Sequence, residues 1–259
     1  MLLAIDVGNT NLVLALGRVG DGISDVWRIR TDAISDAGTC GALMRATLGP
    51  ALDDATDAIV ASVVPDVTPH VVDALGSLTG KPPLVVGAPG VELGIDVNID
   101  RPEQAGADRL VNAVGAKAHH TLPAIVLDFG TATTLDLVAA DGAYEGGVIA
   151  PGVALSIESL ERAAAQLPRL ELRTFEADLP ILGKNTVAAM ESGVFWGYVS
   201  MIDGLLSRLR AAHAGPDDKM RAIMTGGLAG LFADHLAGPV IVDADLTVKG
   251  LFEIFARNR

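Results

Sequence analysis

The sequence predicts an α/β protein built from two duplicated lobes. A short aliphatic strand, a polar turn and a second aliphatic strand occur at residues 2–17 and again at residues 124–138. The two turns begin at Asp6 and Asp128, and each reads Asp-x-Gly followed by a threonine. These aspartates lie 122 positions apart in a chain of 259 residues, close to half of its length. We therefore expect an N-terminal lobe at residues 1–119 and a C-terminal lobe at residues 120–259.

The first lobe is expected to alternate strands with helices. Its strands are continuous aliphatic runs, typical of a sheet covered on both faces, at residues 2–5, 12–17, 58–64 and 84–86. The glycine-containing turn between the first two predicts a hairpin. Helical patterns cover residues 37–52, 68–78 and 107–119.

The second lobe repeats this pattern. Its predicted strands are at residues 124–127, 135–138, 240–242 and a run ending at Met224, and its predicted helices at residues 186–213 and 247–257. Asn185 or Thr186 is a suitable N-cap for the longer helix. Gly193, Gly197 and Gly204 recur along this helix, and each costs about 1 kcal/mol relative to alanine. Close approach of another backbone, within the subunit or across a dimer, would offset that cost.

Composition excludes several classes of function. The chain has 19 Lys and Arg against 32 Asp and Glu, a net charge of −13, which argues against nucleic-acid or anionic-membrane partners. Cys40 is the single cysteine, so neither an intramolecular disulfide nor a cysteine cluster for zinc can form. The first residues have no signal-peptide pattern and no apolar run is long enough to span a bilayer, so we expect a cytoplasmic protein.

Some motifs are set aside. Gly183-Lys184 lacks the earlier glycine of a Walker A loop, because residue 178 is an aspartate. The histidines lack the spacing of metal ligands, and Cys40 is expected to be a buried, unreactive thiol. Asp53-Asp54 and Asp217-Asp218 are interpreted as solvated turn residues.

The two polar turns suit phosphate and metal-ion binding. The glycine lets the backbone turn sharply and present N–H groups to phosphate oxygens, and threonine and asparagine side chains can donate further hydrogen bonds. Asp6 could orient a hydrated Mg²⁺ that neutralises the phosphates. One Asp-x-Gly turn is weak support, but two at equivalent positions, with Gly226-Gly227 after a third strand, are more specific. By themselves these residues predict an ATP-dependent phosphotransferase or an ATPase.

This trio of motifs resembles the acetate-kinase, sugar-kinase, Hsp70 and actin superfamily, which implies two ribonuclease-H-like lobes with an ATP cleft between them. Within that superfamily the chain resembles the type III pantothenate kinases. The motifs that carry the resemblance span nearly the whole chain: Asp6-Val7-Gly8-Asn9-Thr10-Asn11, Gly106-Ala107-Asp108-Arg109, Asp128-Phe129-Gly130-Thr131, Gly146-Gly147-x-Ile149-x-Pro151-Gly152, Gly183-Lys184-Asn185-Thr186 and Thr225-Gly226-Gly227.

The resemblance implies the phosphorylation of pantothenate to 4′-phosphopantothenate by ATP with Mg²⁺, the first step of coenzyme A biosynthesis, in a homodimer. It implies that the ATP phosphates contact Thr131 and the segment Asp6, Val7, Gly8, Asn9, Thr10, Asn11, Leu12 and Val13. Asp128 would bind an activating monovalent cation, K⁺ or NH₄⁺. Pantothenate would contact Ile99, Gly106, Ala107, Asp108, Arg109 and Thr186.

Asp108 is implied to be the general base, and Arg109 has the planar fork that could hold the substrate carboxylate. The alternative is that Asp108 merely complements a helix N-terminus and Arg109 is a surface cation. One departure from the family stands just upstream. Where its members commonly carry Tyr-Asp-Asn-Pro, this chain has Ile99-Asp100-Arg101-Pro102, so a substrate hydrogen bond from a tyrosine is lost.

Two other functions are compatible with the same motifs. The protein could bind nucleotide without catalysis and act as a regulatory or accessory factor, as the missing tyrosine at residue 99 would allow. It could also be a kinase of the same chemistry that acts on another small hydroxy acid. Turnover with pantothenate separates these alternatives, whereas nucleotide binding does not.

Overall fold

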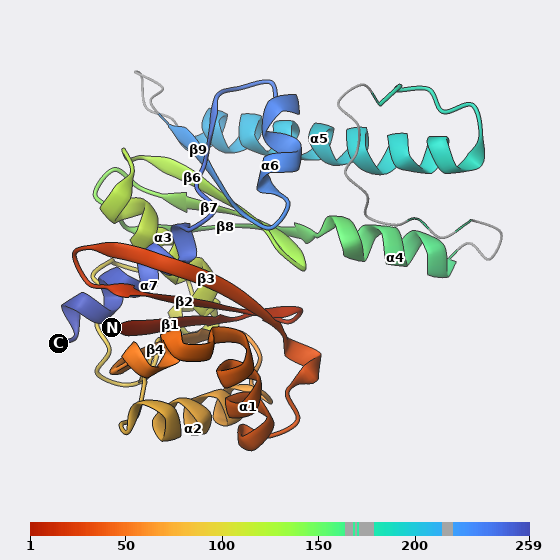
Figure 1. Cartoon of the computed structure of the whole chain (residues 1–259). Helices are drawn as coiled ribbons and strands as arrows, with labels where there is room; N and C mark the ends of the chain where they lie inside the picture. Colours follow the sequence, from red (N-terminus) through yellow and green to blue (C-terminus); the bar gives the residue numbers. More distant parts are fainter. Residues whose placement is uncertain (164–167, 169, 171–178, 214–219) are drawn as a thin grey trace. The chain divides into compact units, whose positions relative to one another are not determined.

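The computed structural model describes residues 1–163, 168, 170, 179–213 and 220–259 (Figure 1). Asp217 and Asp218 lie outside this part of the chain. The strands are β1 Leu2–Val7, β2 Asn11–Arg18, β3 Gly22–Arg30, β4 Asp57–Ser62, β5 Leu84–Val85, β6 Ala124–Phe129, β7 Ala132–Val138, β8 Tyr144–Pro151, β9 Arg221–Gly226 and β10 Val240–Val242. The α-helices are α1 Ala37–Leu48, α2 Thr68–Thr79, α3 Ala107–His119, α4 Val153–Ala163, α5 Thr186–His213, α6 Ala229–Phe232 and α7 Leu246–Arg257.

Contacts divide the chain into two compact units. The first comprises Met1–His120, Gly142–Tyr144 and Asp245–Arg259, and the second comprises Thr121–Asp141 and Glu145–Ala244. The first unit therefore includes the C-terminal helix α7, which packs against α3, in addition to the residues of the predicted N-terminal lobe.

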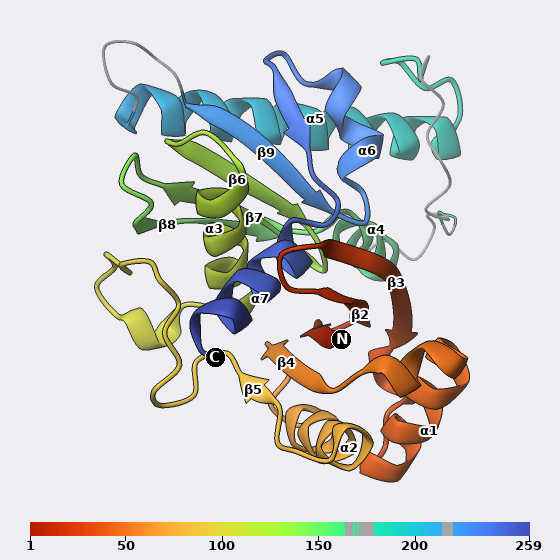
Figure 2. The same cartoon turned by 60° about the vertical axis from the view of Figure 1, so that its left-hand side comes forward.

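The first unit holds a five-stranded sheet in the order β3-β2-β1-β4-β5. β1 pairs antiparallel with β2 and parallel with β4, so the predicted hairpin is confirmed. Alternate residues of β1 face opposite sides of the sheet. Leu3 and Ile5 pack with residues of α1 and α2, whereas Leu2 and Ala4 pack with residues of α3 and α7. Figure 2 shows these two pairs of helices on opposite sides of the sheet. Both faces are thus buried, as the aliphatic strand sequences require.

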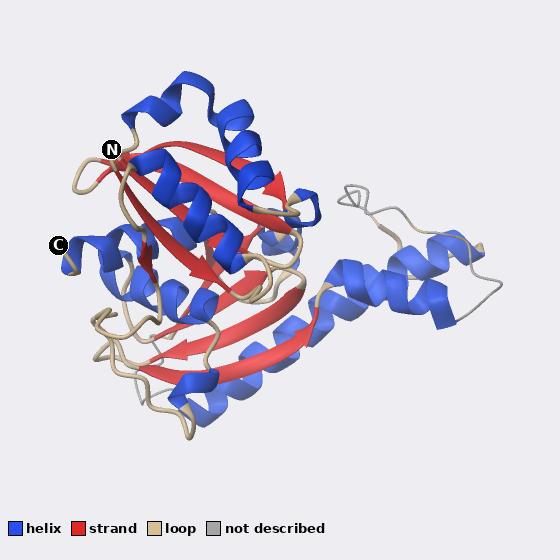
Figure 3. Cartoon of the chain, turned by 90° about the horizontal axis from the view of Figure 1, so that it is seen from below, coloured by secondary structure: helices blue, strands red, loops and turns tan. Residues whose placement is uncertain are grey.

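The second unit repeats the same topology. Its sheet has the order β10-β9-β6-β7-β8, in which β6 pairs antiparallel with β7 and parallel with β9, as β1 pairs with β2 and β4. Ile125, Leu127 and Phe129 of β6 pack in one core with residues of α4, α5 and α6. Figure 3 shows helices, in blue, lying against the strands, in red. The predicted α/β fold with two duplicated sheets is confirmed.

Some elements differ from the sequence prediction. The helix predicted at residues 37–52 ends at Leu48, because Gly49 has a φ of 55° and Pro50 follows it; a 3-10 helix then spans Gly49–Asp54. Strands β3 and β8 and helix α4 were not predicted as elements. Only Ile29 is buried in β3, an edge strand, so its sequence lacks a continuous aliphatic run.

Helix α5 begins as predicted. The backbone N–H of Ala188 donates to Oδ1 of Asn185 (2.9 Å), which makes Asn185 the N-cap. A Cβ placed on Gly193, Gly197 or Gly204 would meet no described atom within 4 Å. Within the described part of the chain, no other backbone therefore approaches these glycines.

Cys40 is buried, as predicted, and desolvation raises the pKa of its thiol to about 11. None of the helices in the described ranges combines the length and apolar character needed to cross a bilayer.

Candidate active site

The first polar turn is a tight connection between β1 and β2. The backbone N–H of Gly8 donates to the carbonyl of Asn11 (3.0 Å), and a Cβ on Gly8 would lie only 3.2 Å from that oxygen. Thr31 closes the turn from outside, because its hydroxyl donates to the carbonyl of Gly8 (2.6 Å) and its N–H donates to the carbonyl of Thr10 (3.0 Å). The loop is thereby fixed before any ligand binds.

Exposure divides the residues of this turn into two groups. Val7 and Leu12 are 0% exposed and pack in the core, so only their backbone could contact a ligand. Asn9 and Thr10 are exposed at the tip. The remaining predicted ligand-binding residues, Asp6, Gly8, Asn11 and Val13, are half-buried.

The motif at residues 106–109 lies at the same end of the first sheet as this hairpin. The N–H of Val63, which follows β4, donates to the carbonyl of Val7 at the end of β1 (3.1 Å). The side chain of Val63 also lies 3.7 Å from the position that a Cβ on Gly106 would take. The structure thus brings the predicted phosphate-binding turn and the predicted base-bearing motif together within one compact unit.

Asp108 lies in the first turn of α3, with Gly106 as the N-cap residue. Its Oδ1 accepts a hydrogen bond from the N–H of Arg109 (2.8 Å), and a negative charge at this end of a helix is favoured by the helix dipole. A Cβ on Gly106 would lie 2.5 Å from the same Oδ1. The carboxylate therefore occupies space that is available only because residue 106 is glycine.

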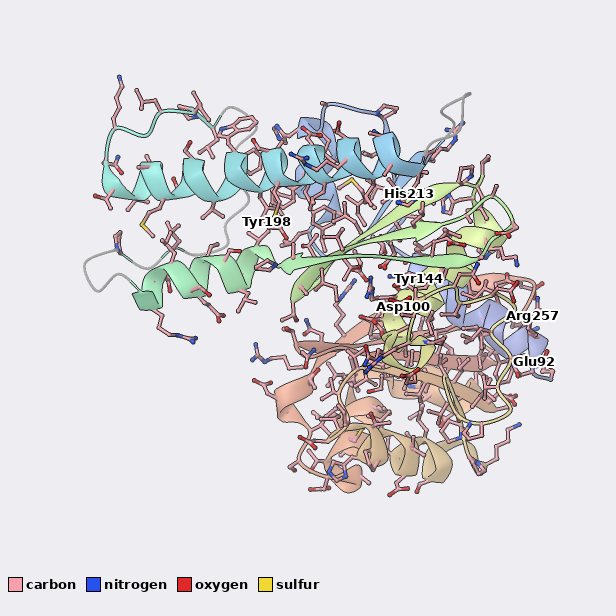
Figure 4. All side chains as sticks on the ribbon, turned by 180° about the vertical axis from the view of Figure 1, so that it is seen from behind. Glu92, Asp100, Tyr144, Tyr198, His213 and Arg257 are labelled. Carbon is pink, nitrogen blue, oxygen red and sulfur yellow. The ribbon has the colours of Figure 1, made fainter. Side chains whose placement is uncertain are left out.

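Arg109 and Asn98, the residue before Ile99, both contact Tyr144. The guanidinium of Arg109 lies over the ring of Tyr144, 5.7 Å from its centroid. Ile99 is half-buried in the loop before α3, directly after Asn98, whose N–H donates to the carbonyl of Tyr144 (2.8 Å). Figure 4 labels Tyr144 and Asp100, the residue after Ile99. Sequence reasoning missed Tyr144, because it stands 35 residues from Arg109.

The second polar turn has its own close packing. The N–H of Gly130 donates to the carbonyl of Ala132 (3.1 Å), and Thr131 is exposed at the tip. Gly152 donates its N–H to the carbonyl of Thr131 (3.1 Å), and a Cβ on Gly152 would lie 2.2 Å from that oxygen. This contact explains why the segment 146–152 accompanies the turn: it holds Thr131 in place.

Asp128 lies on the central strand of the second sheet, with threonines on both sides. It is paired with Thr134 on β7 and Thr225 on β9, and directly paired residues project from the same face. Oγ1 of Thr134 is buried without a hydrogen-bond partner among the described residues. Gly226 has a φ of +89°, and a Cβ there would lie 2.6 Å from Oδ1 of Asp128. The carboxylate of Asp128 and the hydroxyl of Thr134 together form an oxygen donor set of the kind that binds hard cations.

Thr186 is the exposed first residue of α5 in the second unit. The loop before it is fixed by α5 itself, because Ser192 Oγ donates to the carbonyl of Ile181 (2.6 Å) and Trp196 Nε1 donates to the carbonyl of Leu179 (3.0 Å). Thr186 also lines a groove of about 600 Å³ together with Pro151 and Tyr198. Asp108 and Arg109 belong to the other compact unit.

Tyr198 is a second residue that sequence reasoning missed. From α5 its hydroxyl is hydrogen-bonded to Oγ1 of Thr133 and donates to the carbonyl of Pro151 (3.2 Å). Burial raises the pKa of the Tyr198 hydroxyl, which keeps it protonated as a donor. Tyr198 therefore connects α5 to β7, which follows Thr131, and to β8, which precedes Gly152.

Solved structures share this fold. The chain aligns over 99% of its length with an activator of 2-hydroxyisocaproyl-CoA dehydratase from Clostridium difficile with bound ADPNP (TM-score 0.56, 12% identity, 95% of that chain). It aligns over 98% with a ROK family glucokinase from Streptomyces griseus in complex with glucose and AMPPNP (TM-score 0.55, 13% identity, 97% of that chain). At these identities the alignments show the fold class, an α/β fold that this chain shares with both proteins.

Sequence comparison then shows the family. A family profile described as type III pantothenate kinase matches residues 2–208. Type III pantothenate kinases from Paramagnetospirillum magneticum (47% identity) and Caulobacter vibrioides (45% identity) match 100% of this chain and 98% of their own length. The chain belongs to the type III pantothenate kinase family, and it is a kinase that phosphorylates pantothenate in coenzyme A biosynthesis.

Proposed function

We propose that Asp108 is the general base of this kinase. The primary hydroxyl oxygen of pantothenate attacks the γ-phosphorus of ATP, the bond to the β,γ-bridging oxygen breaks, and ADP leaves. Asp108 accepts the hydroxyl proton as the new bond forms. The observation that carries this role is the carboxylate in the first turn of α3, bonded to the N–H of Arg109 and placed in the space that Gly106 leaves open.

Both polar turns are proposed to bind the phosphates of ATP. In the first, the backbone of residues 6–13 and the exposed side chains of Asn9 and Thr10 would donate to phosphate oxygens. In the second, exposed Thr131 would do the same. The hydrogen bonds from Thr31 and Gly152 support this role, because a loop that is already ordered loses little entropy when it binds.

Asp128 is proposed to hold the monovalent cation, K⁺ or NH₄⁺, and Asp6 to orient a water-coordinated Mg²⁺. The buried Oγ1 of Thr134, paired across the sheet from Asp128, supports the first assignment because it offers a second oxygen ligand. Bound cations would supply positive charge that offsets the charge of the phosphates. The side chains of this chain would hold these ions in position.

The pantothenate carboxylate is proposed to bind Arg109. A guanidinium offers two parallel N–H donors that match a carboxylate, and Arg109 is adjacent in sequence to the base. Gly106 and Ala107 would line the site through their backbone, and Ile99 would contribute an apolar contact where relatives use a tyrosine hydroxyl. Thr186 would add a hydroxyl from the start of α5.

A homodimer is proposed through the groove between α4 and α5. Its lining is largely apolar, and Gly193 and Gly197 in its wall have open space above them. Exposed apolar side chains also occur on β8, α4 and α5 and in the loop before α5, at Ile149, Leu155, Leu160, Ile181, Leu182 and Val187. Exposed apolar side chains of this kind favour an interaction site, and a second copy of the chain would bury them.

The test is ATP-dependent phosphorylation of pantothenate by the purified protein, with K⁺ or NH₄⁺ compared with Na⁺. Asp108→Asn keeps the size of the side chain but removes the base, and kcat is expected to fall by about 10²–10⁴-fold. ATP binding by the variant, measured by calorimetry, should be retained. Absence of turnover with any cation, while ATP still binds, would favour the regulatory alternative instead.

A further inference from the structure

The ring of Tyr144 is buried beneath a cationic side chain of the candidate site. Tyr144 is 1% exposed, and the guanidinium of Arg109 lies over its ring at 5.7 Å from the centroid. Both residues belong to the first compact unit, although most of β8 belongs to the second. An arginine within about 6 Å of an aromatic centroid is attracted to the negative face of the ring.

The backbone fixes the position of this ring. The N–H of Tyr144 donates to the carbonyl of Asp96 (2.8 Å), and the N–H of Asn98 donates to the carbonyl of Tyr144 (2.8 Å). This short parallel bridge ties Tyr144 to the loop that continues into Ile99 and the Gly106–Arg109 motif. The backbone that carries the ring is therefore held to this loop by hydrogen bonds on both sides of Val97.

Arg109 lies in the first turn of α3, where the helix dipole disfavours a positive charge. It is the third residue of α3, and the helix dipole places partial positive charge at that end. The π face of Tyr144 supplies the opposite partial charge. An aromatic ring attracts the face of a guanidinium, whereas the N–H donors of the guanidinium point outward in its plane.

We propose that Tyr144 is a positioning residue that holds the guanidinium of Arg109 in place for the substrate carboxylate and so determines selectivity for a carboxylate-bearing substrate. This role rests on the proposed function of Arg109. It differs from that of the tyrosine that relatives carry at residue 99, because Tyr144 acts through its ring face and through Arg109.

The test compares pantothenate with panthenol, in which the carboxylate is replaced by a primary alcohol. Tyr144→Leu removes the ring, and kcat/KM for pantothenate is expected to fall about 5- to 30-fold, mainly through KM, while kcat/KM for panthenol stays within about twofold. Tyr144→Phe keeps the ring and should retain the preference of the wild type. Arg109→Leu should remove the preference, and the double variant with Tyr144→Leu should be no worse than Arg109→Leu alone.

Phe255→Leu is the matched control. It removes a buried ring of the same unit that also carries an arginine, Arg259, at 4.8 Å from the centroid, at the C-terminus of the chain. Its ratio of pantothenate to panthenol activity should equal that of the wild type.

Three results would overturn the proposal: equal losses on both substrates in Tyr144→Leu, loss of the preference in Tyr144→Phe, or additive effects of Tyr144→Leu and Arg109→Leu. If Tyr144→Leu does not fold, the Tyr144→Phe result still decides. A wild-type protein without activity on pantothenate would instead refute the proposed function, so the two failures are distinguishable.

Discussion

A Cβ on Gly106 would lie 2.5 Å from Oδ1 of Asp108, closer than the two atoms can approach. The obstructing atom is the end of a side chain that can rotate away, and a Cβ would otherwise meet Val63 at an ordinary 3.7 Å. The glycine therefore preserves a position of the carboxylate more than it preserves the fold.

Gly106→Ala is accordingly expected to reduce activity without unfolding the protein. Displacing a catalytic group by about 1 Å can cost on the order of 10²-fold, so we expect kcat to fall about 10- to 100-fold, with the thermal midpoint changed by only a few degrees. Steady-state kinetics and thermal unfolding of the same preparation measure the two quantities.

Gly226→Ala provides the contrast. Gly226 has a φ of +89°, and its Cβ would meet backbone atoms of Phe129 at 2.7 Å, so this variant should lose about 1–3 kcal/mol of stability. If Gly106→Ala lost as much unfolding free energy as Gly226→Ala, the role of Gly106 would be structural.

Thr134→Val tests the cation site. The hydroxyl of Thr134 is buried without a hydrogen-bond partner among the described residues, so replacing it by a methyl group should leave the free energy of unfolding unchanged or slightly increased. The ratio of kcat in K⁺ to kcat in Na⁺ should fall toward that of Asp128→Asn. A full response to K⁺ in Thr134→Val would remove Thr134 from the ligand set.

Because the thiol of Cys40 is buried, we expect the free energy of unfolding to fall at alkaline pH. The folded protein keeps this thiol protonated up to a pKa of about 11, whereas the unfolded chain ionises near pH 9. Between these values the unfolded state binds fewer protons, so stability falls as pH rises, by at most about 1.4 kcal/mol per pH unit.

The measurement is urea unfolding of the wild type and of Cys40→Ala at intervals from pH 7 to pH 11. Cys40→Ala should be less stable at pH 7, because it creates a small cavity, but its stability should decline less steeply above pH 9. Parallel pH profiles for the two proteins would show that the thiol is not protected by burial.

Leu182→Glu tests the proposed dimer. Leu182 is 75% exposed and lines a second groove on α5, which shares Gly193 and Gly197 with the groove between α4 and α5. A glutamate there should leave the free subunit folded. A charge buried in an interface should weaken self-association at least about tenfold, as measured by sedimentation velocity over a range of concentrations. Val242→Glu, at an exposed apolar residue of β10, is the control and should sediment like the wild type. A monomeric wild type at assay concentration would refute the dimer.

Features that depend on neighbouring residues could be predicted from the sequence. The two hairpins, helix α3 over Ala107–His119 and the cap at Asn185 follow from aliphatic runs, turn glycines and capping side chains, all within a few residues of one another. The repeat of the Asp-x-Gly turn also predicted that one sheet topology occurs twice, because the same local pattern favours the same pairing.

Only the tertiary structure decided which distant residues meet. Tyr144 lies under Arg109, Tyr198 bonds Thr133 and Pro151, and α7 packs against α3 in the first unit. Periodicity tells which face of an element is apolar, but it does not tell which other element covers that face. The partner is selected by packing and hydrogen bonding over the whole chain. Motifs could therefore nominate the residues proposed to carry the site, whereas the side chains that contact those residues could not be predicted.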